Sequence, residues 1–211
     1  MFESTLILAI RHGQTAWNAG LRMQGQLDIP LDETGYCQAA RLGRALASEK
    51  LAAIYSSDLQ RAVSTAQAVA AATGAPIRPE RALRERSFGC FEGHTYAEIE
   101  VRWPADFSRW RSREPGFGPA GGESLNVFSQ RCVTAVLALA ARHPGETIAV
   151  VAHGGVLDCL YRAAVGIALD APRGWQLDNA TINRLLFNGD GIALVGWNDR
   201  AHLEADPGPF D

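Results

Sequence analysis

The fold of this chain is decided by the stretch Leu6-Ile-Leu-Ala-Ile-Arg-His-Gly-Gln-Thr-Ala-Trp-Asn18. Its first five residues are apolar and predict a short buried strand. The strand ends in Arg11 and His12, and Gly13 then allows a turn. Cations are costly to bury unless an anion meets them. We therefore expect an anion-binding site where this strand ends.

The bulk composition indicates one domain, residues 1–211, that is 47% hydrophobic and can bury a sizeable core. The net charge of -3 gives no basic field for nucleic acid or an anionic membrane, and no run is long enough to span a bilayer. The four cysteines form no C-x-x-C pair, so no zinc site is expected. Glu3 and only five consecutive apolar residues argue against a signal peptide, and we expect a cytoplasmic protein.

The apolar periodicity predicts an α/β fold in which strands alternate with helices. We expect a three-layer α/β/α arrangement, with an open, mostly parallel sheet and helices on both faces. The further strands are predicted at 52–55, 77–79, 147–152, 183–188 and 192–198. The helices are predicted after Asp32, over 59–70, after Ser124 and over 156–165. The tail after His202 is expected to be loose.

A second strand, 147–152, also ends in a histidine followed by glycine, in His153-Gly154-Gly155. In open α/β sheets, ligands bind outside the carboxyl ends of the strands. One histidine before a glycine is usually a core or turn residue. Two at equivalent strand ends predict that His12 and His153 share one crevice.

Arg61 is expected in the first turn of the helix that follows Ser56-Ser57-Asp58. A cation is unfavourable at the positive end of a helix unless it shares an anion with the backbone amides. Two arginines and two histidines suit a tetrahedral dianion, because the guanidinium fork matches phosphate oxygens. No H-E-x-x-H or similar metal motif is present. We therefore expect neither a metal nor a cofactor.

Residues 94–122 differ in composition, because tryptophan and phenylalanine alternate with arginine there. We predict two short helices and a loop that together form a small inserted cap. The loop contains a G-x-G-x-x-G match at 116–121, but no strand precedes it, so it is not interpreted as a dinucleotide site. Aromatic residues mixed with arginine can bind nucleic acid, but no nucleic-acid-binding motif supports that function.

Five motifs occur in the order known from the histidine phosphatase superfamily, which includes the cofactor-dependent phosphoglycerate mutases. They are Arg11-His-Gly-x-Thr-x-x-Asn18, Gln24-Gly25, the segment 56–66, the segment 83–93, and His153-Gly154-Gly155. The chain resembles this family over nearly its whole length. The resemblance implies that His12 is a nucleophile that forms a phosphohistidine. It also implies that Glu85 is the proton donor, and that Arg11, Arg61 and a protonated His153 hold the phosphoryl oxygens.

The expected partner is a small-molecule phosphomonoester. We expect it to be contacted by Asn18, Arg22, Gln24, Gly25 and Gly154. The mutases continue the acid motif as Glu-Arg-His-Tyr-Gly, whereas this chain has Glu85-Arg-Ser-Phe-Gly89, which looks more like the small phosphatases. A phosphatase is therefore preferred. A phosphoglycerate mutase and a non-catalytic phosphoester-binding domain stay as alternatives, and a homodimer is left open.

Overall fold

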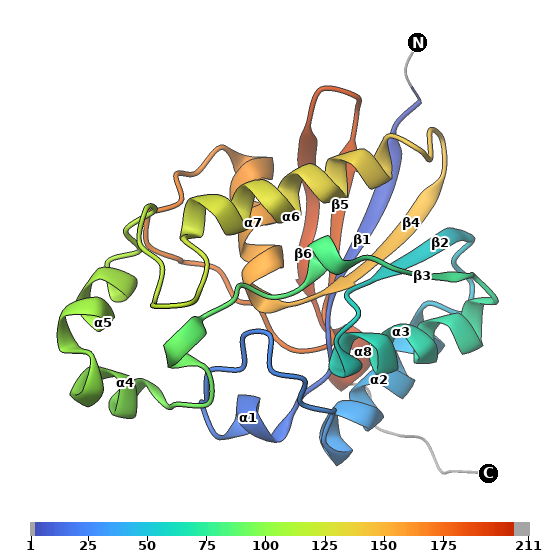
Figure 1. Cartoon of the computed structure of the whole chain (residues 1–211). Coiled ribbons are helices and arrows are strands. Elements are labelled where there is room, and N and C mark those ends of the chain that lie inside the picture. The colour runs from blue at the N-terminus through green and yellow to red at the C-terminus, as the bar shows by residue number, and fades with distance from the viewer. Residues whose placement is uncertain (1–2, 205–211) are drawn as a thin grey trace.

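The computed structural model describes residues 3–204, and a six-stranded sheet forms its centre (Figure 1). The strands are β1 Thr5–Arg11, β2 Leu51–Ser56, β3 Ile77–Pro79, β4 Thr147–Ala152, β5 Ile182–Phe187 and β6 Ile192–Asp199. Their spatial order is β3-β2-β4-β1-β5-β6. The pairs among β1 to β4 are parallel, and β5 is antiparallel to both of its neighbours. The predicted loose tail falls mainly on residues 205–211, outside the described part.

Helices cover both faces of this sheet, so the predicted α/β/α layering is confirmed (Figure 1). The α-helices are α1 Ala16–Ala19, α2 Glu33–Ala45, α3 Gln60–Thr73, α4 Tyr96–Arg102, α5 Pro104–Arg111, α6 Leu125–Ala140, α7 Gly154–Val165 and α8 Ala201–Glu204. Two 3-10 turns lie at η1 Arg81–Leu83 and η2 Gly89–Phe91. Helices α6 and α7 pack on one face, and α2 and α3 pack on the other. Within residues 3–204, no helix has the length and hydropathy needed to cross a bilayer.

The alternation of side chains along β4 divides the core into two clusters. Ile148 and Val150 belong to the cluster under α6 and α7, whereas Ala149 and Val151 belong to the cluster under α2 and α3. All four are fully buried. A strand buried on both faces reads as a continuous apolar run, which is why 147–152 is the clearest strand in the sequence.

The β1–β4 ladder sets the position of the two histidines. Arg11 pairs with Ala152, and the amide of His12 continues the ladder by donating to the carbonyl of Ala152 at 3.0 Å. Helix α7 starts at Gly154, two residues earlier than predicted, because His153 adopts the extended N-cap conformation directly after β4. The free amides of the first turn of α7 therefore lie at the strand end, where an anion is favourable.

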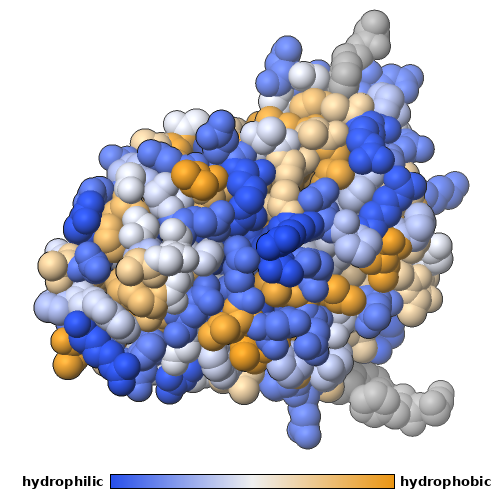
Figure 2. Space-filling view, viewed as in Figure 1, coloured by the Kyte–Doolittle hydropathy of each residue, from blue (hydrophilic) through white to orange (hydrophobic). Residues whose placement is uncertain are grey.

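Helices α4 and α5 lie to one side of the sheet and have an apolar cluster of their own (Figure 1). Its buried members are Met23, Phe91, Ile99, Phe107 and Phe117. The two short helices predicted in 94–122 are thus present. On the face shown in Figure 2, hydrophobic residues occur in small separate groups between hydrophilic ones. No broad apolar patch is visible on that face.

Candidate active site

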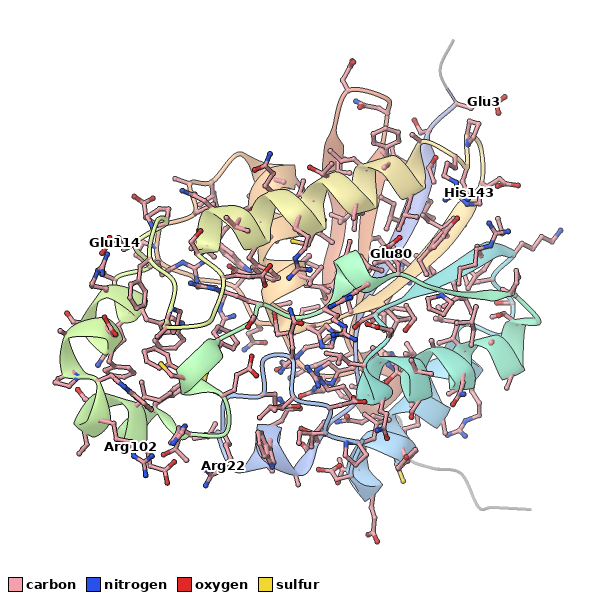
Figure 3. The ribbon with its side chains drawn as sticks, viewed as in Figure 1. Glu3, Arg22, Glu80, Arg102, Glu114 and His143 are labelled. Carbon is pink, nitrogen blue, oxygen red and sulfur yellow. The ribbon has the colours of Figure 1, made fainter. Side chains whose placement is uncertain are left out.

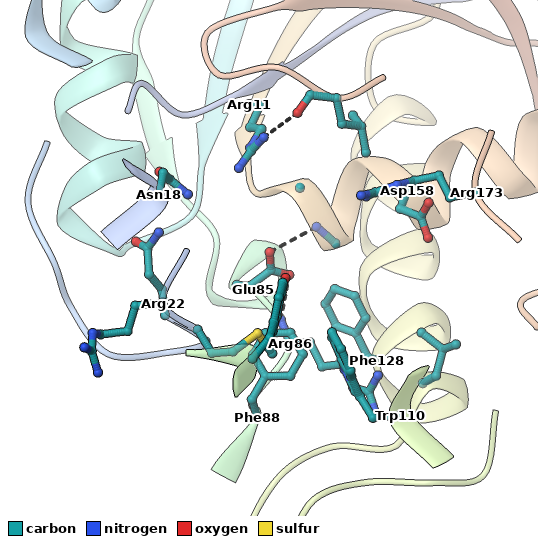
Figure 4. Close-up of a pocket in the computed structure, with 18 of the residues that line it drawn as sticks. Arg11, Asn18, Arg22, Glu85, Arg86, Phe88, Trp110, Phe128, Asp158 and Arg173 are labelled. Carbon is teal, nitrogen blue, oxygen red and sulfur yellow. Dashed lines mark hydrogen bonds between the residues drawn. The ribbon is translucent and has the colours of Figure 1, made fainter. Parts of the chain in front are cut away.

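A pocket of about 520 Å³ opens at the carboxyl ends of β1 and β4. Figure 4 shows Arg11 and Asn18 at one side, Phe88, Trp110 and Phe128 at the other, and Glu85 between them. One end of the pocket is thus lined by cations and amides, and the remainder is lined by aromatic rings together with further charged side chains.

The rings of His12 and His153 lie edge to face, with centroids 5.1 Å apart, and both side chains are buried. The carbonyl of Gly13 lies 2.7 Å from Nδ1 of His12 and accepts the proton of that nitrogen. Nε2 of His12 is then unprotonated. Burial and the charges of Arg61 and Arg11 hold the pKa of His12 well below its usual value. His12 is therefore a neutral, oriented imidazole at neutral pH.

His153 is held by two contacts that fix its tautomer. Nδ1 accepts from Nε of Arg61 at 3.3 Å, so the ring proton lies on Nε2 and is donated to Oγ of Ser57 at 2.8 Å. Burial, and then the charge of Arg61, hold the pKa of His153 well below its usual value. This geometry disagrees with the expectation of a protonated His153, because burial among arginines favours the neutral ring.

Arg61 lies at the start of α3, as predicted, and its side chain is fully buried. Nη1 donates to the carbonyl of Leu27 at 2.9 Å, and Nη2 donates to that of Gly25 at 2.8 Å. With Nε on His153, these bonds use three of its five N–H groups. Burial lowers the pKa of Arg61 to about 10. Arg61 thus fixes the 24–27 loop and still has two donors for an anion.

The residues Ser56-Ser57-Asp58 precede α3, but no side chain of the N-cap residue, Leu59, caps the helix. Ser57 is engaged by His153, and Asp58 pairs with Arg84 at 2.6 Å, so neither residue caps the helix. Asp28 accepts from the amide of Gln60 at 2.7 Å instead. The residues that looked like a local helix start therefore support the pocket.

Arg11 packs against the N-terminus of α7. Its Nη1 donates to the carbonyl of Leu177, while its buried Nε has no partner among the described residues (Figure 4). A Cβ on Gly154 would lie 3.4 Å from that Nε, so glycine allows the close approach. Burial lowers the pKa of Arg11, and the charge of Glu85 raises it. An anion at this point would satisfy both Arg11 and the helix amides.

Glu85 faces the same helix end from the opposite wall. Its Oε2 accepts from the amide of Gly155 at 3.0 Å, and its Oε1 accepts from the amide of Arg86 at 2.9 Å (Figure 4). A Cβ on Gly155 would lie only 2.3 Å from Oε1. The missing side chain of Gly154 therefore leaves space for the guanidinium of Arg11, and that of Gly155 leaves space for the carboxylate of Glu85.

Asn18, Gln24 and Gly25 line the pocket as predicted. Asn18 completes a capping box in which its Oδ1 accepts from the amide of Thr15 at 3.1 Å, so its amide nitrogen is the end left for a ligand. The buried Oε1 of Gln24 has no partner among the described residues. Gly25 adopts a φ of 53°, and a Cβ there would collide with Glu92.

Arg22 lines the pocket but is bound elsewhere. Its Nη1 donates to the carbonyl of Gly93 and to Oε2 of Glu98, the latter at 3.2 Å. It lies at the lower edge of the molecule near Arg102 (Figure 3). Glu92 accepts from the amides of Gln26 and Phe88, and so orders the loop that follows Gln24.

Sequence reasoning missed a buried ion cluster at the pocket wall. Oδ2 of Asp158 accepts from Nη2 of Arg113 at 2.7 Å and from Nε of Arg162 at 3.0 Å. Arg113 also donates to the carbonyl of Leu169 at 2.8 Å. The i, i+4 spacing of Asp158 and Arg162 within α7 was the available signal. This cluster joins the 94–122 segment to helix α7 and to the segment that follows it.

The comparisons with known proteins agree with this geometry. The profile of the histidine phosphatase superfamily (branch 1) matches residues 7–200. Phosphoglycerate mutase-like protein 4 of Arabidopsis thaliana is 39% identical, over 94% of this chain and 86% of that protein. The metal-independent phosphoserine phosphatase of the same plant is 34% identical, over 96% of this chain and 85% of its own.

A similar solved structure is that of Bacillus stearothermophilus YhfR. It is 35% identical, aligns with a TM-score of 0.88, and covers 95% of this chain and 100% of its own. Sequence profile, relatives and structure thus agree over nearly the full length. The chain belongs to branch 1 of the histidine phosphatase superfamily and is an enzyme of the histidine phosphatase type.

Proposed function

We propose that this enzyme hydrolyses small-molecule phosphomonoesters through a covalent phosphohistidine on His12, without a metal. The observation that carries the proposal is the orientation of His12. Its Nδ1 is bound to the carbonyl of Gly13, and its low pKa keeps Nε2 free as a nucleophile. The phosphoserine phosphatase relative, which is named metal-independent, supports the same reaction class.

In the first step, Nε2 of His12 attacks phosphorus, and the bond from phosphorus to the ester oxygen breaks. Glu85 delivers the proton that the leaving oxygen needs. Arg11, Arg61, Asn18 and the amides at Gly154 face the transferred group. They neutralise and position its equatorial oxygens, which is the main requirement of phosphoryl transfer.

In the second step, Glu85 takes a proton from water while the water oxygen attacks phosphorus. The N–P bond breaks, and phosphate leaves a regenerated neutral His12. A bound dianion beside His153 raises the pKa of that ring, because an opposite charge favours the protonated form. Protonation of His153 in that complex requires Nδ1 to release the Nε–H of Arg61, which it accepts in the free enzyme.

Charge neutralisation by side chains supports the metal-independent reaction. Arg11 and Arg61 both reach the end of the pocket that holds His12. Within residues 3–204, no three histidine, cysteine or acidic side chains gather as a metal-binding group. Residues 94–122 act as the cap of the same pocket, because Trp110 and Arg111 contribute to its lining.

The test measures phosphate release in a chelator-containing buffer by the wild type and by His12→Ala. The panel holds p-nitrophenyl phosphate, sugar phosphates, nucleotides and 3-phosphoglycerate. Metal-independent release is expected, and it should fall at least about 10⁴-fold in the variant. Rapid quenching in alkali with a radiolabelled substrate should trap a phosphoryl group on the wild type alone, and later acid treatment should release it.

Other outcomes point to the alternatives. Interconversion of 2- and 3-phosphoglycerate without net release would make the chain a mutase. Loss of both activities, with phosphate compounds still raising the melting temperature, would make it a phosphoester-binding domain. Release that stops with chelator and returns with a divalent cation would overturn the metal-independent mechanism.

A further inference from the structure

The pocket has more positive charge than a phosphate group requires. Seven arginines and two carboxylates, Glu85 and Asp158, are among the described residues that line it. The arginines are Arg11, Arg22, Arg61, Arg86, Arg111, Arg113 and Arg173. Arg11 and Arg61 serve the transferred phosphoryl group. The question is which of the remaining five are available to the rest of the substrate.

Three of the five are engaged by the protein. Arg22 binds Glu98, and Arg113 binds Asp158. Arg86 is buried, and it donates to the carbonyls of Glu123 and Phe117 at 2.9 and 2.8 Å. These guanidinium groups fix loops and wall segments around the pocket.

Arg111 and Arg173 are both solvent-exposed, and neither forms a hydrogen bond or ion pair within residues 3–204. Arg111 lies over the ring of Phe107, 5.8 Å from its centroid. Arg173 has no such ring contact within the same residues. The guanidinium group of Arg173 therefore has all of its N–H donors free for a ligand.

The charge of Arg173 affects the pKa of Arg11, which lies beside His12. After burial and Glu85, it is the next influence on the pKa of Arg11, which it lowers. It also lowers the pKa of Tyr96, against the burial that raises it. Tyr96 begins α4, and its ring lies tilted by 38° against that of Trp110, with centroids 5.3 Å apart. Its hydroxyl has no hydrogen-bond partner within residues 3–204. Arg173 follows α7, so the two groups come to the pocket from different segments.

We propose that Arg173, with the Tyr96 hydroxyl, binds a carboxylate on the leaving group, so that the preferred substrates are phosphomonoesters of small carboxylic acids. This inference rests on the proposed function and deepens it. An arginine fork matches a carboxylate bidentately, and a phenol hydroxyl adds a neutral donor. An unpaired cation close to Arg11 disfavours a substrate whose leaving group carries only an ammonium.

The test uses two pairs of phosphate esters that differ by one carboxylate. They are 3-phosphoglycerate with glycerol 3-phosphate, and phosphoserine with phosphoethanolamine. The wild type should favour the carboxylate member of each pair by about 10- to 100-fold in kcat/KM, as for a charge-assisted hydrogen bond. Arg173→Gln should bring both ratios close to one, while Arg173→Lys should keep an intermediate preference.

Arg111→Gln is the matched control, because it removes the same charge from another exposed arginine of the pocket. It should alter the two ratios less than Arg173→Gln does. Equal kcat/KM within each pair in the wild type, or a larger effect from Arg111→Gln, would overturn the assignment to Arg173. A kcat/KM for fructose 1,6-bisphosphate above those of 3-phosphoglycerate and phosphoserine would mean that Arg173 binds a second phosphate group rather than a carboxylate.

Hydrolysis of p-nitrophenyl phosphate by the wild type tests the phosphatase function independently of the Arg173 subsite. Release from this ester without any carboxylate preference leaves the phosphatase function standing and rejects the Arg173 subsite. No release from any ester rejects the phosphatase function itself. Removal of the Tyr96 hydroxyl, in Tyr96→Phe, should lower the preference part of the way, and an unchanged ratio would remove Tyr96 from the site.

Discussion

The two ends of the pocket are built differently. At the inner end, His12 and His153 are fixed by the β1–β4 ladder, and their partners are backbone carbonyls, a serine and an arginine. At the outer end, Trp110 and Arg173 come from a short helix and a connecting segment. Strand ends place atoms rigidly, whereas loops vary. The two histidines are therefore held at the ends of sheet strands, whereas the outer wall is formed by a cap helix and a connecting segment.

After His12→Ala, the largest expected effect also tests the inner end. Glu85→Gln should lower kcat/KM by about 10²- to 10⁴-fold for an alkyl phosphate, because the poor leaving oxygen needs a proton. The loss should be much smaller for p-nitrophenyl phosphate, whose leaving group is already acidic. Steady-state kinetics on both esters would show the difference.

Glu92→Gln is the control for that variant. Its side-chain oxygen still accepts from the amides of Gln26 and Phe88, so the loop is retained. Equal losses on the two esters in Glu85→Gln, or an equal loss in Glu92→Gln, would contradict the proton-donor role of Glu85.

A smaller effect is expected from Gly155→Ala. The new methyl group would lie 2.3 Å from Oε1 of Glu85, so the carboxylate must move. A displacement of that kind costs up to about 100-fold in kcat. Gly116→Ala is the matched control, because a methyl group there would meet no atom within 4 Å. Similar activity in the two variants would show that the inner end is less rigid than described.

The third expectation concerns stability against pH. The pKa values of His12 and His153 lie well below 6.5 in the folded state, so the unfolded chain binds more protons below that pH. The free energy of unfolding should therefore fall as pH drops through 6.5. Each histidine contributes on the order of 1 kcal/mol between pH 7.5 and 5.5.

Urea unfolding at both pH values would measure this loss. His12→Asn should lose less stability than the wild type over the same interval, by on the order of 1 kcal/mol. His202→Asn is the comparison, because the pKa of His202 is also lowered. The His202 side chain bonds to the carbonyl of Ala180 and is not part of the pocket lining. A wild type equally stable at both pH values would refute the depressed pKa values.

The smallest effect is expected at the outer end. Trp110 lines the pocket, whereas Arg109 is bound to Glu114 at 2.7 and 2.8 Å and is absent from the lining. Trp110→Ala should change relative kcat/KM among substrates by about 2- to 10-fold, the scale of an aromatic contact. Arg109→Ala should leave those ratios within about twofold, as for an exposed ion pair. The reverse order would mean that the outer wall is assigned wrongly.

More of the residues at the inner end of the pocket than at the outer end could be predicted from the sequence. The runs at 6–10 and 147–152 are unambiguous strands, and a histidine followed by glycine lies within two residues of the end of each. The local pattern therefore predicts the position that the fold gives to His12 and His153. The role of Ser57 was hidden, because a serine before a helix reads as a cap. Arg173 gave no signal, since an exposed arginine in a loop has no periodicity, and only the folded chain shows that it reaches the pocket.

The β1–β4 ladder has a consequence for how the protein refolds. It pairs the beginning of the chain with a strand more than half the chain away, so its closure is a non-local event that helices can precede. No state without this ladder brings the two histidine rings together. Recovery of catalytic activity after denaturant removal therefore times the closure of the central sheet, whereas recovery of far-ultraviolet circular dichroism reports the helices.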